Sequence, residues 1–388
     1  MILMRWLFLG LVLGFLAGGV RIPAATADAP SPLPEQPRIA MLWAPAANLK
    51  KGADSVANWA RHSVIVVGID DLGLEWAAGK NSASLAETLR PETVAAARET
   101  LDCVHKLNPA AAVLCEVYFF EDDVENYPPD HLWWLRDRNG KKTQFWPGCH
   151  QMDLANPAYV THVARRIAAV HQVTGPAAGI FLDNLRFEAA DKAAWTSLLE
   201  QVRALCGPDL VILVNAGWDS TDMSWVCPLV NGIMYEDAVV HTADRDVEAF
   251  YGRIAAFDRL LRQPRVSVNE KFGRRSDAGK MARDWIRTLV YTDMAFLYSD
   301  STQEHAHAWA AAWDVRLGVA RTPPPLSEPG KLARREFANG LALWLSASAK
   351  GEITVELPNA MREVLTNRVV KAVTLKPDSG AVLERRRP

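Results

Sequence analysis

The sequence predicts a (β/α)8 TIM barrel followed by a small C-terminal antiparallel β-domain. Short apolar segments alternate with amphipathic helical patterns along most of the chain, as expected for a parallel sheet buried on both faces. The eight apolar segments favour a closed barrel over an open sheet. After the proline-rich stretch 322–325 the helical period stops and short alternating strands follow, which indicates a separate β-domain.

Each element is expected from its own segment of sequence. The barrel strands are expected at 38–43, 63–69, 112–119, 178–183, 210–216, 232–236, 265–270 and 295–299. The clearest helices between and after them are expected at 91–107, 157–173, 191–205, 244–261, 277–292 and 303–317. Asn156 before Pro157 is a typical N-cap and first helical residue. The tail strands are expected at 335–346, 352–357, 369–375 and 379–384.

The N-terminus has the features of a secretory signal peptide. A short positive region is followed by an apolar stretch and by small residues at Ala25 and Ala27, so we expect cleavage after residue 27. The roughly 15 apolar residues fall short of the ~20 needed to span a bilayer, and no stable membrane insertion is expected afterwards. The expected organisation is a signal peptide at 1–27, a linker at 28–37, the barrel at 38–320 and the β-domain at 335–385. The expected location is secreted or periplasmic.

Charge and motif content exclude several functional classes. The formal net charge is −2, and no basic stripe indicates a nucleic-acid partner. No glycine-rich nucleotide loop follows a strand, and the five scattered cysteines contain no zinc-binding spacing. Asp70 and Asp71 together suggest a metal-dependent deacetylase, but His305 and His307 lie in a helical pattern that would point their rings apart. We therefore expect neither a metal nor another cofactor.

Two acids stand where expected barrel strands end. Asp183 closes the strand at 178–183, and Glu236 closes the strand at 232–236 with Asp237 as its neighbour. The C-terminal ends of barrel strands form the face that carries active sites, and alternate strands supply the same interior layer. Paired carboxylates in one cleft are the catalytic groups of most glycoside hydrolases. Asp183 and Glu236 are therefore the expected catalytic pair.

Other polar and aromatic residues near the strand ends are candidates for binding a sugar. The long connection at 120–156 contains several aromatic residues, and loops of this kind are often functional. Most of the tryptophans are expected to be core or loop anchors, while exposed rings would stack on a sugar. The candidate substrate-binding residues are Trp43, Asp70, Glu116, Tyr118, Trp146, Asn215, Trp218, Asp237 and Glu270. Glu116 lies inside its expected strand, where a paired interior charge is the alternative.

Several segments in order resemble bacterial glycoside-hydrolase families of the (β/α)8 type, distant relatives of the α-galactosidase and polygalactosaminidase groups. They are LWWLRDRNG at 132–140, MDLANP at 152–157, GIFLDN at 179–184, NGIMYE at 231–236 and REFANG at 335–340. The resemblance implies that Asp183 is the nucleophile and Glu236 the proton donor. Related families often carry a second acid soon after the first, and Glu188 matches that position poorly, which leaves the substrate class open.

The sequence thus predicts a secreted glycoside hydrolase that cleaves an oligo- or polysaccharide without a cofactor. The alternative is a carbohydrate-binding barrel without catalysis, which would keep the aromatic loop but need not bring its two acids into one cleft. The separation of the Asp183 and Glu236 carboxyl groups distinguishes the two hypotheses, because hydrolysis requires roughly 5–10 Å.

Overall fold

The computed structural model describes residues 35–49, 55–79, 81–219, 222–237, 247–300 and 305–385. The expected signal peptide at 1–27 and most of the expected linker lie outside these ranges. Within them, no helix is both long enough and apolar enough to cross a bilayer.

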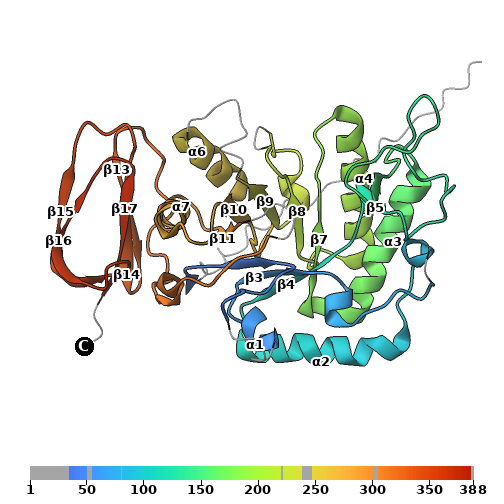
Figure 1. The fold of residues 1–388 in the computed structure, drawn as a ribbon, viewed down its shortest axis with the longest axis horizontal. Coiled ribbons are helices and arrows are strands. Elements are labelled where there is room, and N and C mark those ends of the chain that lie inside the picture. The colour runs from blue at the N-terminus through green and yellow to red at the C-terminus, as the bar shows by residue number, and fades with distance from the viewer. Residues whose placement is uncertain are drawn as a thin grey trace, which may run out of the picture. The chain divides into compact units, whose positions relative to one another are not determined.

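A parallel eight-stranded sheet forms the body of the protein (Figure 1). Neighbouring strands follow one another in chain order, as in a (β/α)8 barrel. A parallel bridge between Ile39 and Phe296 brings the first and last strands together, which confirms the predicted barrel. The strands are β2 (Ala40–Leu42), β3 (Val64–Val67), β4 (Ala112–Glu116), β7 (Gly179–Leu182), β8 (Ile212–Asn215), β9 (Gly232–Glu236), β10 (Val268–Phe272) and β11 (Ala295–Ser299).

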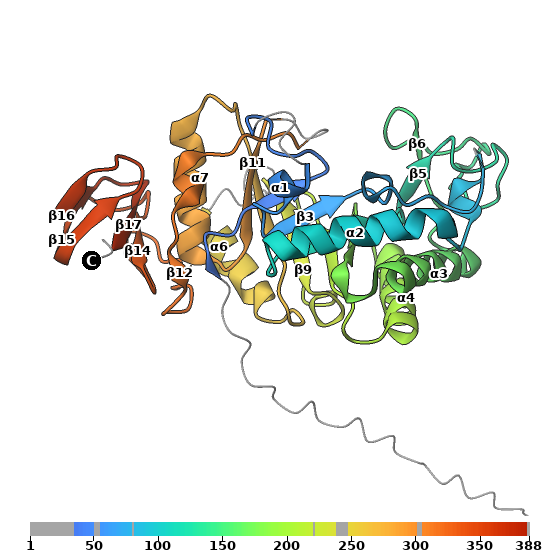
Figure 2. The ribbon, with the colours of Figure 1, turned by 90° about the horizontal axis from the view of Figure 1, so that it is seen from below.

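Helices pack around this sheet, as Figure 2 shows for α2, α3 and α4. The α-helices are α1 (Ser55–Trp59), α2 (Pro91–Leu107), α3 (Pro157–Thr174), α4 (Ala189–Cys206), α6 (Val247–Asp258) and α7 (Ala278–Tyr291). Short 3-10 helices occupy Asp70–Leu72, Ala83–Leu85, Gly175–Ala177, Cys227–Leu229 and Ala311–Asp314. The predicted start of α3 is confirmed, because the Asn156 side chain accepts a hydrogen bond from Ala158 N and Pro157 follows it.

The predicted helix at 303–317 is wrong over its described part, 305–317. The chain there forms no α-helix and contains only the 3-10 turn Ala311–Asp314, and the strand β12 (Gly318–Val319) follows it. His305 has a left-handed φ of 47°, and His307 forms an antiparallel bridge with Ser299. Backbone hydrogen bonds to neighbouring segments thus replace the intrahelical ones that the spacing of Trp309 and Trp313 suggested.

The expected linker ends earlier than residue 37. Glu35 and Gln36 form the strand β1, which pairs with Val319 and Gly318 of β12. Gln36 is buried, and its backbone carbonyl accepts a hydrogen bond from Leu317 N. The proline content suggested an extended linker, but these two residues form a two-stranded sheet with β12 instead.

Apolar side chains fill the barrel interior and fix how closely its strands approach. The interior set is Ala40, Leu42, Val64, Val66, Leu114, Phe181, Leu213, Met234, Val266, Val268, Ala295 and Leu297. Glycine begins β7 and β9 because a Cβ on Gly179 would lie 2.4 Å from Val211 O, and one on Gly232 would lie 2.8 Å from Ser267 N. The two glycines let the neighbouring strands approach closely at the start of β7 and β9. The larger interior side chains, such as Phe181 and Met234, pack further along these strands, before their C-terminal ends.

A five-stranded antiparallel sheet follows the barrel, in the order β13-β14-β17-β15-β16. Its strands are β13 (Leu332–Phe337), β14 (Gly340–Leu345), β15 (Ile353–Glu363), β16 (Val369–Leu375) and β17 (Ser379–Arg385). The predicted C-terminal β-domain is confirmed, although the single strand expected at 335–346 is a hairpin. Its Trp344, Ala342 and Val382 belong to the same buried cluster as Trp285 and Ile286 of α7.

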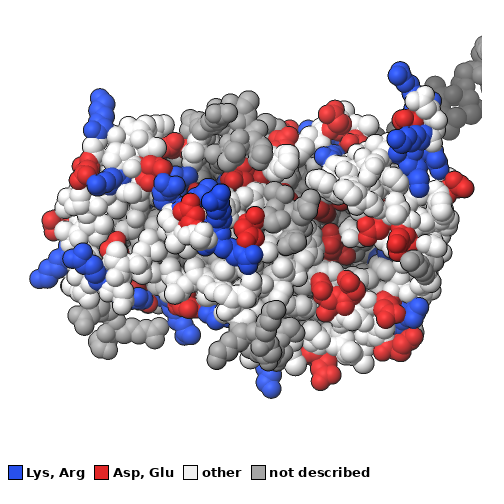
Figure 3. All heavy atoms as spheres, in the orientation of Figure 1, with Lys and Arg blue, Asp and Glu red and all other residues white. Residues whose placement is uncertain are grey.

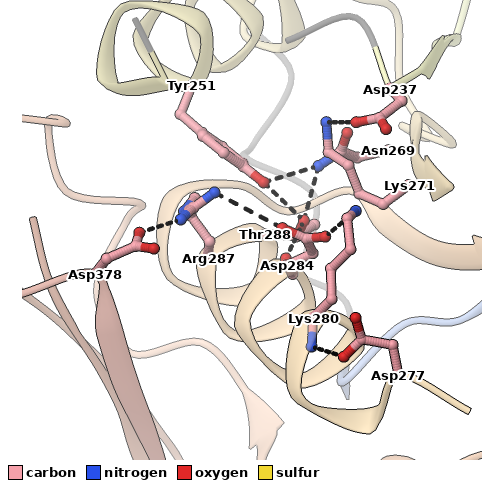
Figure 4. A network of polar contacts seen from close by, with 10 residues as sticks. All are labelled: Asp237, Tyr251, Asn269, Lys271, Asp277, Lys280, Asp284, Arg287, Thr288 and Asp378. Atoms are coloured by element: carbon pink, nitrogen blue, oxygen red, sulfur yellow. Dashed lines mark hydrogen bonds and ion pairs between the residues drawn. The ribbon is translucent and has the colours of Figure 1, made fainter. Parts of the chain in front are cut away.

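Ion pairs reinforce this contact. Arg335 of β13 is fully buried and pairs with Asp293, while its guanidinium also donates to the carbonyl of Leu289. Arg287 of α7 reaches Asp378 at 2.6 Å, at one edge of the polar network in Figure 4. The β-domain is therefore attached to the barrel by both apolar and charged contacts.

Candidate active site

The alternation of barrel strands places a layer of polar residues above the apolar interior. Phe181 and Met234 point into the barrel, so the residues two positions later, Asp183 and Glu236, point the same way. The other strands add residues of the same parity, namely Glu116, Asn215, Glu270 and Ser299. The visible face in Figure 3 shows acidic atoms inside a hollow.

Asn215 connects the two predicted catalytic acids. Its side-chain amide donates to Asp183 Oδ1 at 2.7 Å and also to Glu236 Oε1. Asp183 additionally accepts from the backbone and side-chain nitrogens of Asn184, each at 2.9 Å. Because one nitrogen contacts both acids, their nearest oxygens are at most roughly 6 Å apart. The structure therefore places these two carboxyl groups in one cleft.

The surroundings of these carboxyl groups favour the protonated form of Glu236. Burial, with the negative charges of Glu270 and Asp183, raises the pKa of Glu236 to about 7. Burial also raises the pKa of Asp183, but hydrogen bonds from Asn215 and Asn184 oppose this shift. Asp183 receives more donors than Glu236, so the negative charge of the pair rests on Asp183 while Glu236 holds the proton.

His305 completes this cluster, and the sequence reasoning missed it. Its Nδ1 donates to both oxygens of Glu270 at 2.8 and 2.9 Å, and the hydroxyl of Ser299 donates to the same carboxylate. Burial lowers the pKa of His305, but the charges of Glu270, Glu236 and Asp183 outweigh it and leave the pKa above its usual value. The predicted helix at 303–317 placed His305 and His307 on different faces and gave neither ring a place in the cleft.

Glu236, Glu270 and His305 are also the described residues that could hold a metal ion. Their ligand atoms all lie within 4.8 Å of one another. However, the Glu270 carboxylate already accepts hydrogen bonds from His305 Nδ1 and from the Ser299 hydroxyl group. This pattern satisfies the carboxylate with protein donors, and it fits a buried ion pair.

Glu116 lies at the end of β4 rather than inside the strand, and it faces the same cleft. Its Oε2 accepts from Trp43 Nε1 at 2.9 Å. Burial, together with the charge of Asp183, raises the pKa of Glu116 to about 8. Glu116 is thus a protonated carboxyl group near neutral pH, able to donate to a hydroxyl group as well as to accept from the indole.

The remaining polar candidates lie in different surroundings. Asp70 is exposed in a 3-10 turn at the exit of β3, whereas Tyr118 is half-buried beyond the end of β4. Asp237 is only 7% exposed and pairs with the buried Lys271 at 3.3 Å (Figure 4). Glu270 has no exposed surface. Its proposed direct contact with substrate is therefore corrected, because its carboxylate is enclosed by Ser299 and His305.

Trp146 and Trp218 are exposed, at 49% and 47% of their surface. Trp146 follows Phe145 in the long connection after β4, in which the short strands β5 (Glu121–Asp123) and β6 (Cys149–Gln151) pair antiparallel. Trp134 of the same connection is buried. The structure thus separates ring faces that are open to solvent from those that anchor the loop, as the sequence analysis expected in general terms.

Left-handed backbone conformations gather where barrel strands end. Trp43, Asn184, Asp237 and His305 have φ values of 50°, 57°, 44° and 47°. These residues follow β2, β7, β9 and β11. Such conformations are unfavourable for residues with a Cβ, and they persist where surrounding contacts hold them, typically at functional sites.

Comparisons with solved structures find barrels of the same kind. A noncanonic maltogenic α-amylase, AmyB from Thermotoga neapolitana, has a TM-score of 0.50 at 12% identity and covers 89% of this chain and 95% of its own. Eubacterium rectale Amy13B has a TM-score of 0.51 at 10% identity and covers 91% and 98%. The likeness is one of fold. Comparisons of the sequence with models of protein families and with curated proteins find no match.

Two further charged residues near the cleft escaped the sequence analysis. Glu121 is buried, and its Oε1 accepts from the Asn184 side chain at 2.7 Å. Burial and the charge of Asp183 raise the pKa of Glu121 well above its usual value. Arg186 lies over the rings of Phe120 and Phe145. Glu121 begins the three-residue strand β5 and Arg186 lies in the loop after β7, and neither segment is long enough for a periodic pattern to show which way a side chain points.

Proposed function

We propose that this chain is an exported glycoside hydrolase that cleaves an oligo- or polysaccharide with Asp183 and Glu236. The observation that carries the proposal is the shared contact of both carboxyl groups with Asn215. The maltogenic α-amylase AmyB, a barrel of comparable fold, supports the same class of reaction. Export is supported by the N-terminal sequence alone.

In this mechanism the two acids have different roles. Asp183 attacks the anomeric carbon while Glu236 gives its proton to the leaving glycosidic oxygen, so the C–O bond breaks and a glycosyl ester forms. Water then attacks the same carbon and Glu236 takes up its proton, which releases Asp183. Asn215 holds both groups toward the reacting centre.

The short separation of the carboxyl groups favours retention of configuration. Retaining enzymes keep their carboxyl groups about 5–5.5 Å apart, whereas inverting enzymes leave about 6.5–9.5 Å for a water molecule. Proton NMR of the first-formed product would show which anomer appears. Retention is expected, and an inverted product would contradict the nucleophilic role of Asp183.

Substrate binding is assigned to the open positions around the pair. Trp43 and Glu116 line the cleft beside Asp183, and Trp146 and Trp218 offer exposed rings for stacking on sugars. Asp70 and Tyr118 lie at the exits of the adjacent strands. These are the positions at which we expect sugar hydroxyl groups and ring faces to bind.

The proposal is tested by a screen of the mature protein on diverse polysaccharides, read by the release of reducing ends. Asp183→Asn and Glu236→Gln should each lower kcat by several orders of magnitude on any substrate found. Their melting temperatures should stay within a few °C of that of the unaltered protein, since both changes preserve side-chain size and Asp183→Asn gives up only the hydrogen bond accepted from the Asn184 side chain.

The alternative of a binding barrel without catalysis predicts a different result. Such a protein would retain affinity for a polysaccharide in both variants and release no reducing ends in any form. Glu99→Gln, at an exposed position of α2, serves as a control that leaves turnover unchanged. Full activity in either acid variant would mean that another carboxyl group carries the reaction, with Glu116 and Glu121, which both interact with Asp183, as the alternatives.

A further inference from the structure

We infer that Glu270 and His305 form a buried ion pair beside Glu236 that sets the pH range in which Glu236 keeps its proton. This inference rests on the proposed function, in which Glu236 is the proton donor. The pair is a positioning unit, since Glu270 is enclosed and has no surface open to a substrate.

The geometry gives the pair a fixed place next to the proton donor. Glu270 accepts from Ser299 and from His305, both on or beyond the last barrel strand. Glu270 also lies in register with Glu236 across β9 and β10. The ligand atoms of Glu236, Glu270 and His305 fall within 4.8 Å of one another, so the charge state of either partner acts on Glu236 over a short distance.

The groups that face Glu236 come from every neighbouring strand. Glu270 and Asp183 are negative and favour its protonated form, whereas the positive His305 and the amide of Asn215 favour ionisation. His305 itself faces these three carboxyl groups and packs edge-on against the ring of Trp43, with Phe272 nearby. Because His305 carries the charge opposite to that of Glu270, its position next to Glu270 determines how far the negative charge of Glu270 raises the pKa of Glu236.

A second histidine pair anchors the segment that carries His305. His62 Nδ1 lies 3.0 Å from the carbonyl of Asn58, so it carries a hydrogen, and its Nε2 accepts from His307 Nε2 at 2.9 Å. Both rings are buried, and burial lowers their pKa values to about 4 and about 3. The anchor is thus neutral across the pH range in which His305 and Glu236 titrate.

Further contacts hold the same segment on its other side. Ala47 N donates to the carbonyl of His307, and Asn48 exchanges two hydrogen bonds with the backbone of Trp309. The left-handed conformation of His305 then directs its ring toward Glu270. These contacts keep the ion pair in one geometry while its charges change.

The test is a pH titration of the Glu236 carboxyl group by carbon-13 NMR in protein labelled at glutamate side-chain carboxyls. Loss of one signal in Glu236→Gln assigns it. In His305→Gln, which removes the positive charge and keeps a donor for Glu270, the Glu236 midpoint should rise by about 1 pH unit. In Glu270→Gln, which removes the negative charge that raises the Glu236 pKa more than Asp183 does, the midpoint should fall.

A matched control exists elsewhere in the fold. His162 of α3 is also buried and contacts a glutamate, Glu87, at 2.8 Å, so His162→Gln breaks a histidine–glutamate pair that is not among the groups acting on Glu236. It should leave the Glu236 midpoint unchanged. A midpoint that moves equally in this control, or in neither site variant, would overturn the inference.

The titration separates this inference from the proposed function because it needs no turnover. Opposite shifts in the two site variants support the ion-pair role even if no substrate is ever cleaved, in which case only the proposed function fails. If a substrate is found, the alkaline limb of kcat/KM should move with the NMR midpoint. A Glu236 titration that changes when EDTA is added would instead show a bound metal ion and overturn the ion-pair assignment.

Discussion

Glu116, at the C-terminal end of β4, shows how one side chain in the cleft can hold a structural hydrogen bond and also have a raised pKa. Glu116 takes a hydrogen bond from Trp43 and has a pKa of about 8 because it is buried near Asp183. In the unfolded chain the same group has its ordinary pKa of 4.5. Between these values the folded protein holds a proton that the unfolded chain has lost. The stability from this group is therefore complete below 4.5 and is lost as the pH rises through 8.

We expect Glu116→Gln to remove this part of the pH dependence. Glutamine keeps an acceptor for the Trp43 indole but cannot ionise, so the variant should gain stability relative to the unaltered protein as the pH rises. Melting temperatures measured at about pH 5 and about pH 9 should differ less in the variant, by a few °C. An identical pH dependence in both proteins would show that Glu116 is ionised in the folded state.

At the scale of elements, the connection after β4 is the most elaborate part of the site. It contains the β5–β6 hairpin, and Trp134 pairs with Met152 across it while Tyr127 and His131 pack nearby. Trp134 is 2% exposed and Trp146 is 49% exposed. Two tryptophans of one loop therefore serve different purposes, one as an anchor and the other as an open surface.

This contrast gives a paired prediction. Trp146→Ala should raise KM several-fold on a polysaccharide substrate with little change in melting temperature, because its exposed ring contributes little to folding. Trp134→Ala should destabilise the protein by about 3–5 kcal/mol, as expected for a large buried ring. Thermal unfolding and steady-state kinetics on both variants check this. If Trp146→Ala lost as much stability as Trp134→Ala, the Trp146 ring would be an anchor of the loop as well.

The elements that the sequence predicts well are those with long periodic patterns. Helix α2 has the predicted bounds, because Pro91 begins it and its apolar face repeats regularly. The segment after β11 fails because the spacing of Trp309 and Trp313 imitates a helix, while the hydrogen bonds that decide its path come from Asn48, Ala47 and Ser299. Such long-range partners leave no trace in local sequence.

The same limit applies to the candidate site. Asp183 and Glu236 are predictable because strand parity and strand ends are visible in the sequence. Glu121 and His305 are not, since both lie beyond a strand in segments whose direction is set by tertiary contacts. The burial of Glu270 is likewise invisible, because it depends on Ser299 and His305 covering it from another part of the chain.

At the scale of the whole molecule, buried charges join the C-terminal β-domain to the barrel. Arg335 is fully buried, contacts Asp293 and donates to the carbonyls of Leu289 and Thr292. Its neighbour Arg334 points the other way and pairs with Glu336 at the surface. The two arginines differ by one position in a strand, so they test the attachment with matched chemistry.

Arg335→Leu should destabilise the protein by about 3–5 kcal/mol, because it leaves Asp293 without its buried partner. Arg334→Leu should change stability by less than about 1 kcal/mol, as for other exposed pairs. Urea unfolding of both variants, followed by tryptophan fluorescence, measures the difference. Equal effects would show that the apolar contact with α7 alone holds the β-domain in place.

The left-handed residues after β2, β7 and β9, and His305 in the segment beyond β11, have a consequence for how this protein can change over time. Each is held in a backbone conformation that costs about 1–3 kcal/mol, so the rim of the barrel is not where the fold is most stable. Glycine would relieve that strain, but at Trp43 it would remove the indole that donates to Glu116, and at His305 it would remove the imidazole that pairs with Glu270. Because losing a buried partner costs about 3–5 kcal/mol, the contacts of these side chains outweigh the strain of their backbone, and heat resistance and an intact cleft select for the same residues.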